Sequence, residues 1–439
     1  MKIAVVGTET IGLVNATCFA ELGHKVTCVG NNPEIIERLK RGKLPVYEPG
    51  LEERLNRNQR DGNLAFANEI KPLIDGSDII ICATPTPAAA DGTIDLRQVA
   101  ELARTIGQNV TKYFAVAIVS TVPIGTARQL RAALNIELEK RGANIHYDIV
   151  SIPGMLRDGS AVSDFLNPDR IVAGVGSDKG EELVNELYKP LIEKGTTLIL
   201  TDQTSAEMIK YASNAMLANR ISFMNDIANL SELVGADIDK VREGIGADPR
   251  IGNQYLKSGC GYGGTSLPKD VKALIKTAEK AGYPLKVMKA VDEVNDSQQK
   301  VVFKKLLKCY NGNIKGKNVA IWGLAFKPET SDVRESTALV TIEQLLSAGC
   351  NVSVYDPVAL DEAKKVLGDK VTYANDMYDA VLDADALLLI TEWKQFNRPS
   401  WGVVARSMKS KVVIDGRNLY SVSDMKKHGF DYHRIGKNI

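Results

Sequence analysis

The sequence lacks several features that mark particular classes of protein. Its six cysteines include no CxxC pair, and its four histidines form no cluster along the sequence, so we expect no zinc site. The formal net charge is only +1, with Lys and Arg spread along the chain, which argues against nucleic acid or an anionic membrane as a partner. Its apolar runs, such as ALLLIT at 386–391, are too short to span a bilayer.

The first residues, MKIAVVG, also lack the features of a signal peptide. Only Lys2 precedes the apolar run, and no small-residue cleavage site follows it, so we expect a β-strand there. Together with scattered cysteines that we expect to be reduced and mostly buried, this predicts a cytoplasmic protein.

What is present is a repeated strand–turn–helix pattern. The apolar stretch 2–7, a glycine turn, the helical spacing of 11–22 and a second apolar stretch at 25–30 predict a β-α-β unit. Further apolar stretches continue the pattern as predicted strands, at 78–85, 115–123, 148–153, 170–175 and 197–201. These stretches predict a parallel, doubly wound sheet over residues 1–200.

The rest of the chain divides into a helical segment and a second sheet domain. Residues 205–233 contain no Pro or Gly and predict one long helix, followed by shorter helices to about residue 307. The strand pattern resumes at 314–326 and continues through 351–357, 386–391 and 411–418. We therefore expect an α/β protein with two Rossmann-like domains, 1–200 and 314–439, joined by a long central helix and a helical dimerisation segment, 201–313.

Motifs that follow one another along the chain give it a family resemblance. They are YEPGLEE (47–53), STVPIGT (120–126), GSAVSDFLNPDRIV (159–172), EMIKYASNA (207–215), DPRIGNQYL (248–256), GYGG with LPKD (261–270), GLAFKPETSDVRES (323–336) and DGRN (415–418). In this set and order they resemble the UDP-glucose/UDP-sugar 6-dehydrogenases. The resemblance implies NAD-linked oxidation of the C6 alcohol of a UDP-sugar to a carboxylate. It also implies an NAD-binding first domain, a homodimer built on the helical segment, and a UDP-sugar-binding last domain.

The glycine turn after the first predicted strand departs from the dinucleotide-binding pattern. The pattern is G-x-G-x-x-G, and the chain has GTETIG, with Gly7 and Gly12 in place and Glu9 at the middle glycine. The side chain of Glu9, beginning with its Cβ, is expected to obstruct the pyrophosphate of NAD; the less favoured alternative is that it points into solvent and leaves the turn intact. Its negative charge would add a repulsion of roughly 3–4 kcal/mol at about 4–5 Å and an effective dielectric of 20.

The end of the second predicted strand lacks the acid that binds the adenosine ribose. Gly30 stands there, followed by Asn31 and Asn32, which offer weaker, neutral hydrogen bonds. Thr121 and Arg334 do match NAD-contacting positions of the family, and for Arg334 this match outweighs the alternative of a surface ion pair with a neighbour such as Glu335. We therefore expect NAD as the cofactor, with weakened binding.

Three residues match the family's group for the first oxidation, in which the C6 hydroxyl loses a proton. They are Lys210, Asn214 and Asp270, and Lys210 and Asn214 lie four residues apart on one face of the predicted helix.

The groups for the second oxidation are altered. The resemblance implies a cysteine that captures the aldehyde as a thiohemiacetal, but Ser266 stands in that position. A serine hydroxyl is far less acidic than a thiol, and Cys260 nearby is expected to be a buried apolar residue. The family's two glutamates of the Asn-Pro-Glu-Phe-Leu-x-Glu-Gly pattern are replaced by Gly154, which has no carboxylate, and Asp158, which is shorter.

The positions that the resemblance assigns to the UDP-sugar are retained. They are Arg250, Tyr255, Lys257, Phe326, Lys327 and Arg417. The cationic side chains suit a diphosphate and the aromatic ones a uracil or sugar face. In the family, the arginine that corresponds to Arg250 reaches across the dimer interface. The resemblance therefore implies a site shared between the two subunits.

Three interpretations follow. The first is a dehydrogenase scaffold severely impaired by Glu9, Gly30, Gly154 and Ser266, whether by natural decay or by deliberate alteration. The second is an active UDP-glucose 6-dehydrogenase, or one that stops after the first oxidation. The third is a non-catalytic nucleotide-sugar binder or a dimer partner of an active homologue.

Overall fold

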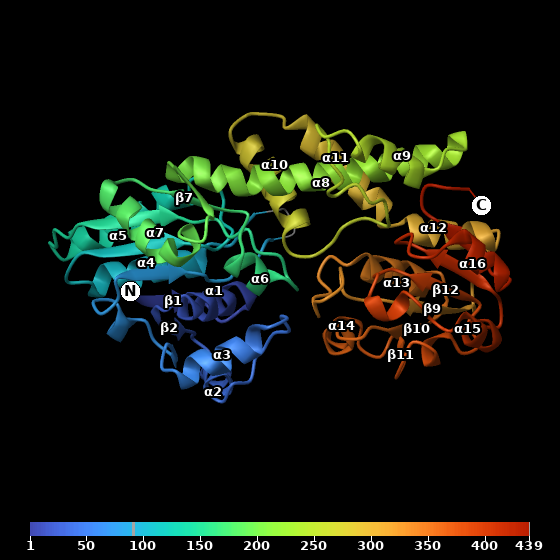
Figure 1. Ribbon diagram of the computed structural model, residues 1–439, viewed down its shortest axis with the longest axis horizontal. Coiled ribbons are helices and arrows are strands. Elements are labelled where there is room, and N and C mark those ends of the chain that lie inside the picture. Colours follow the sequence, from blue (N-terminus) through green and yellow to red (C-terminus); the bar gives the residue numbers. More distant parts are fainter. Residues whose placement is uncertain (90–92, 439) are drawn as a thin grey trace. The chain divides into compact units, whose positions relative to one another are not determined.

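A computed structural model describes residues 1–89 and 93–438 and divides them into two compact units, Met1–Ser213 and Asn214–Ile439 (Figure 1). The predicted helix at 205–233 is confirmed as α8 (Gln203–Val234), which runs through the boundary between the units. The three-domain division at residues 200 and 313 stays a prediction. Among the described residues, no helix combines the length and the apolar character that a membrane span needs.

Unit 1 is built on an eight-stranded sheet of order β3-β2-β1-β4-β5-β6-β7-β8. Its pairs are parallel except β6 with β7, which meet antiparallel at Ser151 and Gly174. The strands are β1 (Lys2–Val6), β2 (Lys25–Val29), β3 (Leu64–Ala67), β4 (Ile79–Cys82), β5 (Phe114–Ile118), β6 (Tyr147–Ser151), β7 (Arg170–Gly174) and β8 (Thr197–Thr201).

Helices cover both faces of this sheet because successive side chains of its buried strands point to opposite sides. Ile3 and Val5 of β1 belong to one apolar core, whereas Ala4 between them belongs to the other. The first core is closed by α1, α2, α3, α6 and α7, and the second by α4 and α5. Their bounds are α1 (Thr10–Glu21), α2 (Pro33–Lys40), α3 (Leu51–Arg60), α4 (Arg97–Asn109), α5 (Thr126–Lys140), α6 (Ala161–Leu166) and α7 (Asp178–Ile192), with the short η1 (Lys71–Leu73).

Unit 2 contains a six-stranded, fully parallel sheet of order β11-β10-β9-β12-β13-β14. The strands are β9 (Asn318–Trp322), β10 (Asn351–Tyr355), β11 (Thr372–Tyr373), β12 (Ala386–Leu389), β13 (Val412–Asp415) and β14 (Asp431–Arg434). The helices are α9 (Ile238–Gly246), α10 (Leu267–Lys280), α11 (Lys286–Gln298), α12 (Val301–Cys309), α13 (Thr337–Ser347), α14 (Leu360–Leu367), α15 (Trp401–Ser407) and α16 (Val422–Lys427), with the short η2 (Asp379–Val381) and η3 (Lys394–Phe396).

Both units therefore confirm the expected fold class of two doubly wound sheets and a long helix. In unit 2, α8, α10 and α11 share a small apolar core of their own that includes Ala218, Val271 and Met288. The strands β3, β11 and β14 were not predicted. Strand β14 has the sequence DYHR, which offers no apolar run to detect.

Candidate functional site

The turn between β1 and α1 is closely packed and needs its first and last glycines. A Cβ on Gly7, whose φ is +140°, would lie 2.2 Å from the carbonyl oxygen of Ala83, and one on Gly12 would lie 2.2 Å from the oxygen of Gly7. Glu9 between them has φ −85°, an exposed side chain, and a carbonyl that accepts from the N–H of Leu13 at 2.9 Å. The turn itself thus accommodates a glutamate, whose charge stands at the N-terminus of α1.

The end of β2 presents no carboxylate. The N–H of Gly30 donates to the carbonyl of Ala67, and a Cβ at this position would lie 2.5 Å from Cγ2 of Thr8. An aspartate here would therefore require the Thr8 side chain to rotate. Asn32 caps α2 through Oδ1, which accepts from the N–H groups of Glu34 and Ile35 at 3.0 and 3.3 Å. Its side chain is already engaged, so it is a poor substitute for a ribose-binding acid.

A small pocket in unit 1 brings together two of the predicted site residues, Thr121 and Lys210. Its lining consists of Ile118, Ser120, Thr121, Val122, Ser151, Pro153, Glu207 and Lys210. Lys210 is only 6% exposed, and its Nζ donates to the carbonyl oxygen of Gly154 at 2.6 Å. The ammonium of Lys210 therefore points to the loop that contains Gly154, where the family resemblance implies a glutamate. A Cβ on Gly154 would meet only the carbonyl oxygen of Val119, at 3.5 Å, so a side chain would fit there.

The same pocket contains Glu207, which the sequence analysis did not single out. Its carboxylate accepts from the N–H groups of Gly125 and Ala127 at 2.5 and 2.9 Å, at the N-terminus of α5. Burial raises the pKa of Glu207, although those backbone donors oppose the shift. Glu207 lies one helical turn before Lys210, and its place in the motif EMIKYASNA was the available signal. It holds α8 against α5 and so positions Lys210.

A second buried glutamate holds the loop that contains Asp158, which is half-buried. Glu48, from the motif YEPGLEE, accepts from the N–H groups of Gly159 and Ala161 at 2.7 and 2.8 Å. The loop is thus anchored at the start of α6. The glutamate of the motif YEPGLEE at position 48 therefore has a structural role, which the sequence alone did not reveal.

In unit 2, Asn214 and Asp270 form a direct pair. Nδ2 of Asn214, on α8, donates to Oδ2 of Asp270, on α10, at 2.5 Å. Asp270 is fully buried, and Asn214 is 8% exposed. A buried carboxylate is costly without polar partners, so the pair fixes the relative position of these two helices as well as the Asn214 amide.

Ser266 stands at the start of α10, one turn before Asp270. It is exposed, and its hydroxyl caps no backbone N–H of that helix. Cys260, by contrast, is fully buried in the apolar core of unit 2, and burial raises the pKa of its thiol. The expectation that Cys260 is a buried apolar residue is confirmed, and its sulfur is not placed to replace a nucleophile at Ser266.

Two of the residues predicted to bind the sugar nucleotide flank the glycine-rich loop of unit 2. Arg417 donates from Nη1 to the carbonyl of Gly261 at 2.9 Å and from Nε to that of Ile390 at 2.6 Å. The ring of Phe326 is so close to Gly264 that a Cβ there would lie 2.6 Å from it. Arg417 and Phe326 therefore help to shape this loop.

The other predicted residues lie nearer the surface of unit 2. Arg250 is 87% exposed and pairs with Asp248 at 2.6 Å. Arg334 pairs with Asp332 at 2.7 Å, which is a surface ion pair with a neighbour of the kind considered as the alternative to NAD contact. Asp332 lies two residues before Arg334 and accepts from both its backbone N–H and its guanidinium, a local arrangement that Glu335 does not offer. The remaining three are Tyr255, with φ +59°, Lys257, which is exposed, and Lys327, which is half-buried.

Family models cover nearly the whole chain in order. The NAD binding domain of the UDP-glucose/GDP-mannose dehydrogenase family matches residues 1–192, its central domain 204–297 and its UDP binding domain 320–422. The chain belongs to this family. It is 44% identical over 436 residues to the UDP-glucose 6-dehydrogenase TuaD of Bacillus subtilis, covering 99% of this chain and 93% of that protein.

Other family members give the same picture. The UDP-glucose 6-dehydrogenase of Pseudomonas aeruginosa is 40% identical over 442 residues, covering 100% of this chain and 98% of that one. The solved structure of a UDP-glucose dehydrogenase from the archaeon Pyrobaculum islandicum matches with a TM-score of 0.91 and 35% identity, covering 100% of this chain and 98% of that one.

The turn after β1 and the end of β2 meet the requirements of a dinucleotide site only in part. Gly7 and Gly12 keep the close strand–helix packing that such a turn requires. Glu9 and Gly30 do not fit, because one adds an anion where a phosphate would approach and the other offers no acceptor for ribose hydroxyls. The family membership supports NAD as the cofactor.

Proposed function

We propose that this chain is a UDP-sugar-binding member of the family whose oxidation of the sugar C6 alcohol is severely impaired. The proposal rests on Glu9, Gly30, Gly154 and Ser266, which stand where the family resemblance implies Gly, Asp, Glu and Cys, within an intact framework. The turn after β1 keeps its packing, and the buried Asn214–Asp270 pair remains.

The residues for the first oxidation still offer their chemistry. Lys210 offers an ammonium and Asn214 an amide, which are the groups that the family resemblance assigns to holding the C6 oxygen and to stabilising negative charge as its proton leaves. The carboxylate of Asp270 orients the Asn214 amide through their 2.5 Å hydrogen bond. When bound, NAD supplies the acceptor for the hydride. In this chain that acceptor would be held poorly, so the first oxidation is limited by cofactor affinity.

The second oxidation lacks its reacting groups. The Ser266 hydroxyl gives far less of the nucleophilic anion at neutral pH than a thiol with an ordinary pKa of about 8.5. Gly154 brings no carboxylate to the loop that Lys210 contacts, and the nearby Cys260 is buried. Any turnover would therefore stop at the aldehyde.

For binding, we propose UDP-glucose or a related UDP-sugar as the ligand of unit 2. The proposal rests on the family's UDP binding domain over 320–422 and on UDP-glucose 6-dehydrogenases as full-length relatives. The residues assigned to the ligand are Arg250, Tyr255, Lys257, Phe326, Lys327 and Arg417. The first experiment is NADH formation from UDP-glucose and excess NAD, counted per subunit over hours.

The outcomes separate the alternatives. Sustained production of two NADH per sugar would show an active enzyme and overturn the proposal. One NADH per sugar with released aldehyde would show that only the second oxidation is lost. The expected result is that no NADH forms, while calorimetry shows that UDP-glucose binds. If neither ligand binds, the remaining interpretation is a structural partner of an active homologue.

A repair experiment tests the assignment of the four positions. We expect the combined change E9G, G30D, G154E and S266C to restore oxidation of UDP-glucose. The pair G154E and S266C alone, and the pair E9G and G30D alone, should each fall short, because they repair different requirements. A repaired protein that stays inert with all common UDP-sugars, while remaining folded, would contradict the proposed function.

We also propose a homodimer and a cytoplasmic location. On α8, Met216, Phe223 and Leu230 recur at intervals of seven residues and are 60%, 54% and 52% exposed, which leaves an apolar face uncovered. We expect Phe223→Asp to convert a dimer to a monomer in light scattering, whereas Leu382→Asp, at another exposed apolar side chain, should not. The six free cysteines suit a reducing compartment.

A further inference from the structure

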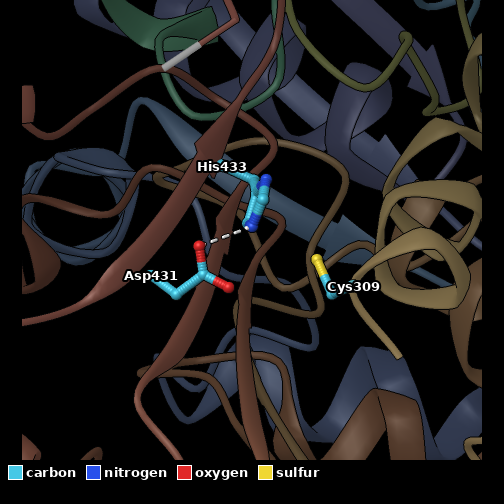
Figure 2. A group of neighbouring side chains, drawn as sticks. All are labelled: Cys309, Asp431 and His433. Carbon is cyan, nitrogen blue, oxygen red and sulfur yellow. Dashed lines mark ion pairs between the residues drawn. The ribbon is translucent and has the colours of Figure 1, made fainter. Parts of the chain in front are cut away.

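Three side chains with metal-ligating atoms meet in unit 2, outside the residues assigned above (Figure 2). They are Cys309, the last residue of α12, and Asp431 and His433, which alternate on β14. One atom from each, Sγ, a carboxylate oxygen and an imidazole nitrogen, lies within 4.8 Å of the other two. Cys309 is far from β14 in the sequence, so only the fold brings it to the others.

The backbone holds these residues firmly. Strand β14 pairs with β13 along its length, and the N–H of Asp431 donates to the carbonyl of Lys411 at 2.8 Å. Tyr432, between the two ligands, is buried on the opposite face, where its hydroxyl donates to Asp415 at 2.8 Å. The alternation of the strand therefore directs Asp431 and His433 toward the end of α12. Sites on helices and strands are better fixed than sites on loops.

The neighbouring groups around the three side chains are few and defined. Nε2 of His433 lies 3.0 Å from Oδ1 of Asp431, but that buried nitrogen makes no hydrogen bond of good geometry to the described residues. Burial, reinforced by the charge of Asp431, raises the pKa of the Cys309 thiol. Lys305, near the thiol, is paired with Glu232 at 2.8 Å. The thiol, the carboxylate and the imidazole therefore already lie close together without an ion.

Although the sequence alone predicted no zinc site, we propose that Cys309, Asp431 and His433 form one, with one coordination position left for water. A sulfur, an imidazole nitrogen and a carboxylate oxygen are the ligands that Zn²⁺ takes in proteins. Around a tetrahedral zinc ion such atoms are about 3.3–3.6 Å apart, so small rotations of the observed side chains suffice. On binding, the Cys309 S–H bond is broken, its proton passes to solvent, and a sulfur–zinc bond forms. The ion would join the end of α12 to the edge strand β14.

The test begins with chelator-treated full-length protein and zinc chloride. We expect calorimetry to show one zinc per chain. Cobalt(II) should give a near-ultraviolet thiolate-to-metal absorption band. Zinc should raise the unfolding midpoint followed by tryptophan fluorescence, because Trp322, Trp393 and Trp401, the three tryptophans, lie in unit 2.

Variants locate the ion. Cys309→Ser and His433→Gln should each weaken zinc binding by roughly a hundredfold or more, and Asp431→Asn by roughly tenfold. His428→Gln, a half-buried histidine near β14, is the control and should bind zinc as the parent does. No zinc uptake by the parent, or uptake that survives both Cys309→Ser and His433→Gln, would overturn the proposal. These readouts need neither NAD nor a UDP-sugar, so they are independent of the proposed function.

Discussion

The two sheets of this protein share a strand order but carry different residues after their second strands. Strands β3-β2-β1-β4-β5-β6 of unit 1 and β11-β10-β9-β12-β13-β14 of unit 2 follow the same doubly wound pattern. A glycine with positive φ follows the first strand of each unit in chain order, Gly7 after β1 and Gly323 after β9. At the end of the second strand, unit 1 has Gly30 and unit 2 has Asp356.

Asp356 is buried and satisfied entirely by its own unit. Its carboxylate accepts from Leu324 N, Ala325 N, Val358 N, Ala359 N and Trp393 Nε1, at 2.7 to 3.0 Å. The carboxylate that a dinucleotide site would direct at a ribose is thus turned inward in unit 2 and missing in unit 1. The comparison teaches that one topology carries different residues at this position, so function has to be argued from the individual residues and not from the fold alone.

The largest effect is expected from Asp356→Ala, which tests how far unit 2 depends on its inward carboxylate. Removal leaves several buried N–H groups without an acceptor and should lower the free energy of unfolding by about 3–5 kcal/mol. Urea unfolding followed by tryptophan fluorescence reports on this unit. Asp361→Ala, at an exposed acid on α14, is the control, and equal effects of the two changes would refute the role of Asp356.

Next come the first glycines of the two turns. Gly7→Ala and Gly323→Ala each place a Cβ within 2.2–2.4 Å of neighbouring atoms at positive φ, and should cost about 2–4 kcal/mol. Hydrogen exchange resolves the effect in each unit. Gly62→Ala and Gly312→Ala are matched controls, because they have positive φ but no atom within 4 Å of the added Cβ. If the controls lose as much stability, close packing is not the cause.

A smaller effect is expected from Glu9→Gly, which makes the unit 1 turn more like a dinucleotide site. NAD affinity should rise by roughly 10–100-fold, since repulsion from an exposed carboxylate is partly screened by solvent. Glu9→Gln separates the charge from the obstruction, and UDP-glucose binding should not change in either variant. Unchanged NAD affinity in Glu9→Gly would show that the middle glycine is not what limits binding.

The smallest effect concerns the C-terminal end of α1. The hydrogen bond from Arg57 lowers the pKa of Glu21 below its ordinary value of 4.5, so the ionised form is favoured by folding. This contribution is present above pH 4.5 and is lost as the pH falls through the lowered pKa. Glu21→Gln should therefore destabilise unit 1 by at most about 1 kcal/mol at pH 7, because the pair is partly exposed.

Hydrogen exchange of β1 and α1 across pH 3–7 measures the Glu21 effect. The difference between the parent and the variant should narrow toward the acid end, and Glu53→Gln, at an exposed glutamate of α3, should show no difference. A gap that stays constant with pH would mean that packing, rather than the charge of Glu21, stabilises the helix.

Sequence patterns predicted most of the strands because these are buried on both faces and appear as apolar runs. The sequence also predicted that Lys210 and Asn214 lie on one face of a helix and that glycines form the turn after the first strand. Strand β14 was not, since only one of its faces is buried and its sequence is polar. The roles of Glu207 and Glu48 were missed because their partners are backbone N–H groups far along the chain.

The sequence by itself determined the two sheets, the long helix, the family and the four altered positions, because these depend on residue type and local spacing. Only the tertiary structure decided that Glu9 leaves its turn intact, that Asp270 is buried against Asn214, and that Asp356 faces inward. It alone brought Cys309 to Asp431 and His433. Packing between segments that are far apart in the sequence sets which polar groups meet, and no local sequence pattern encodes such long-range contacts.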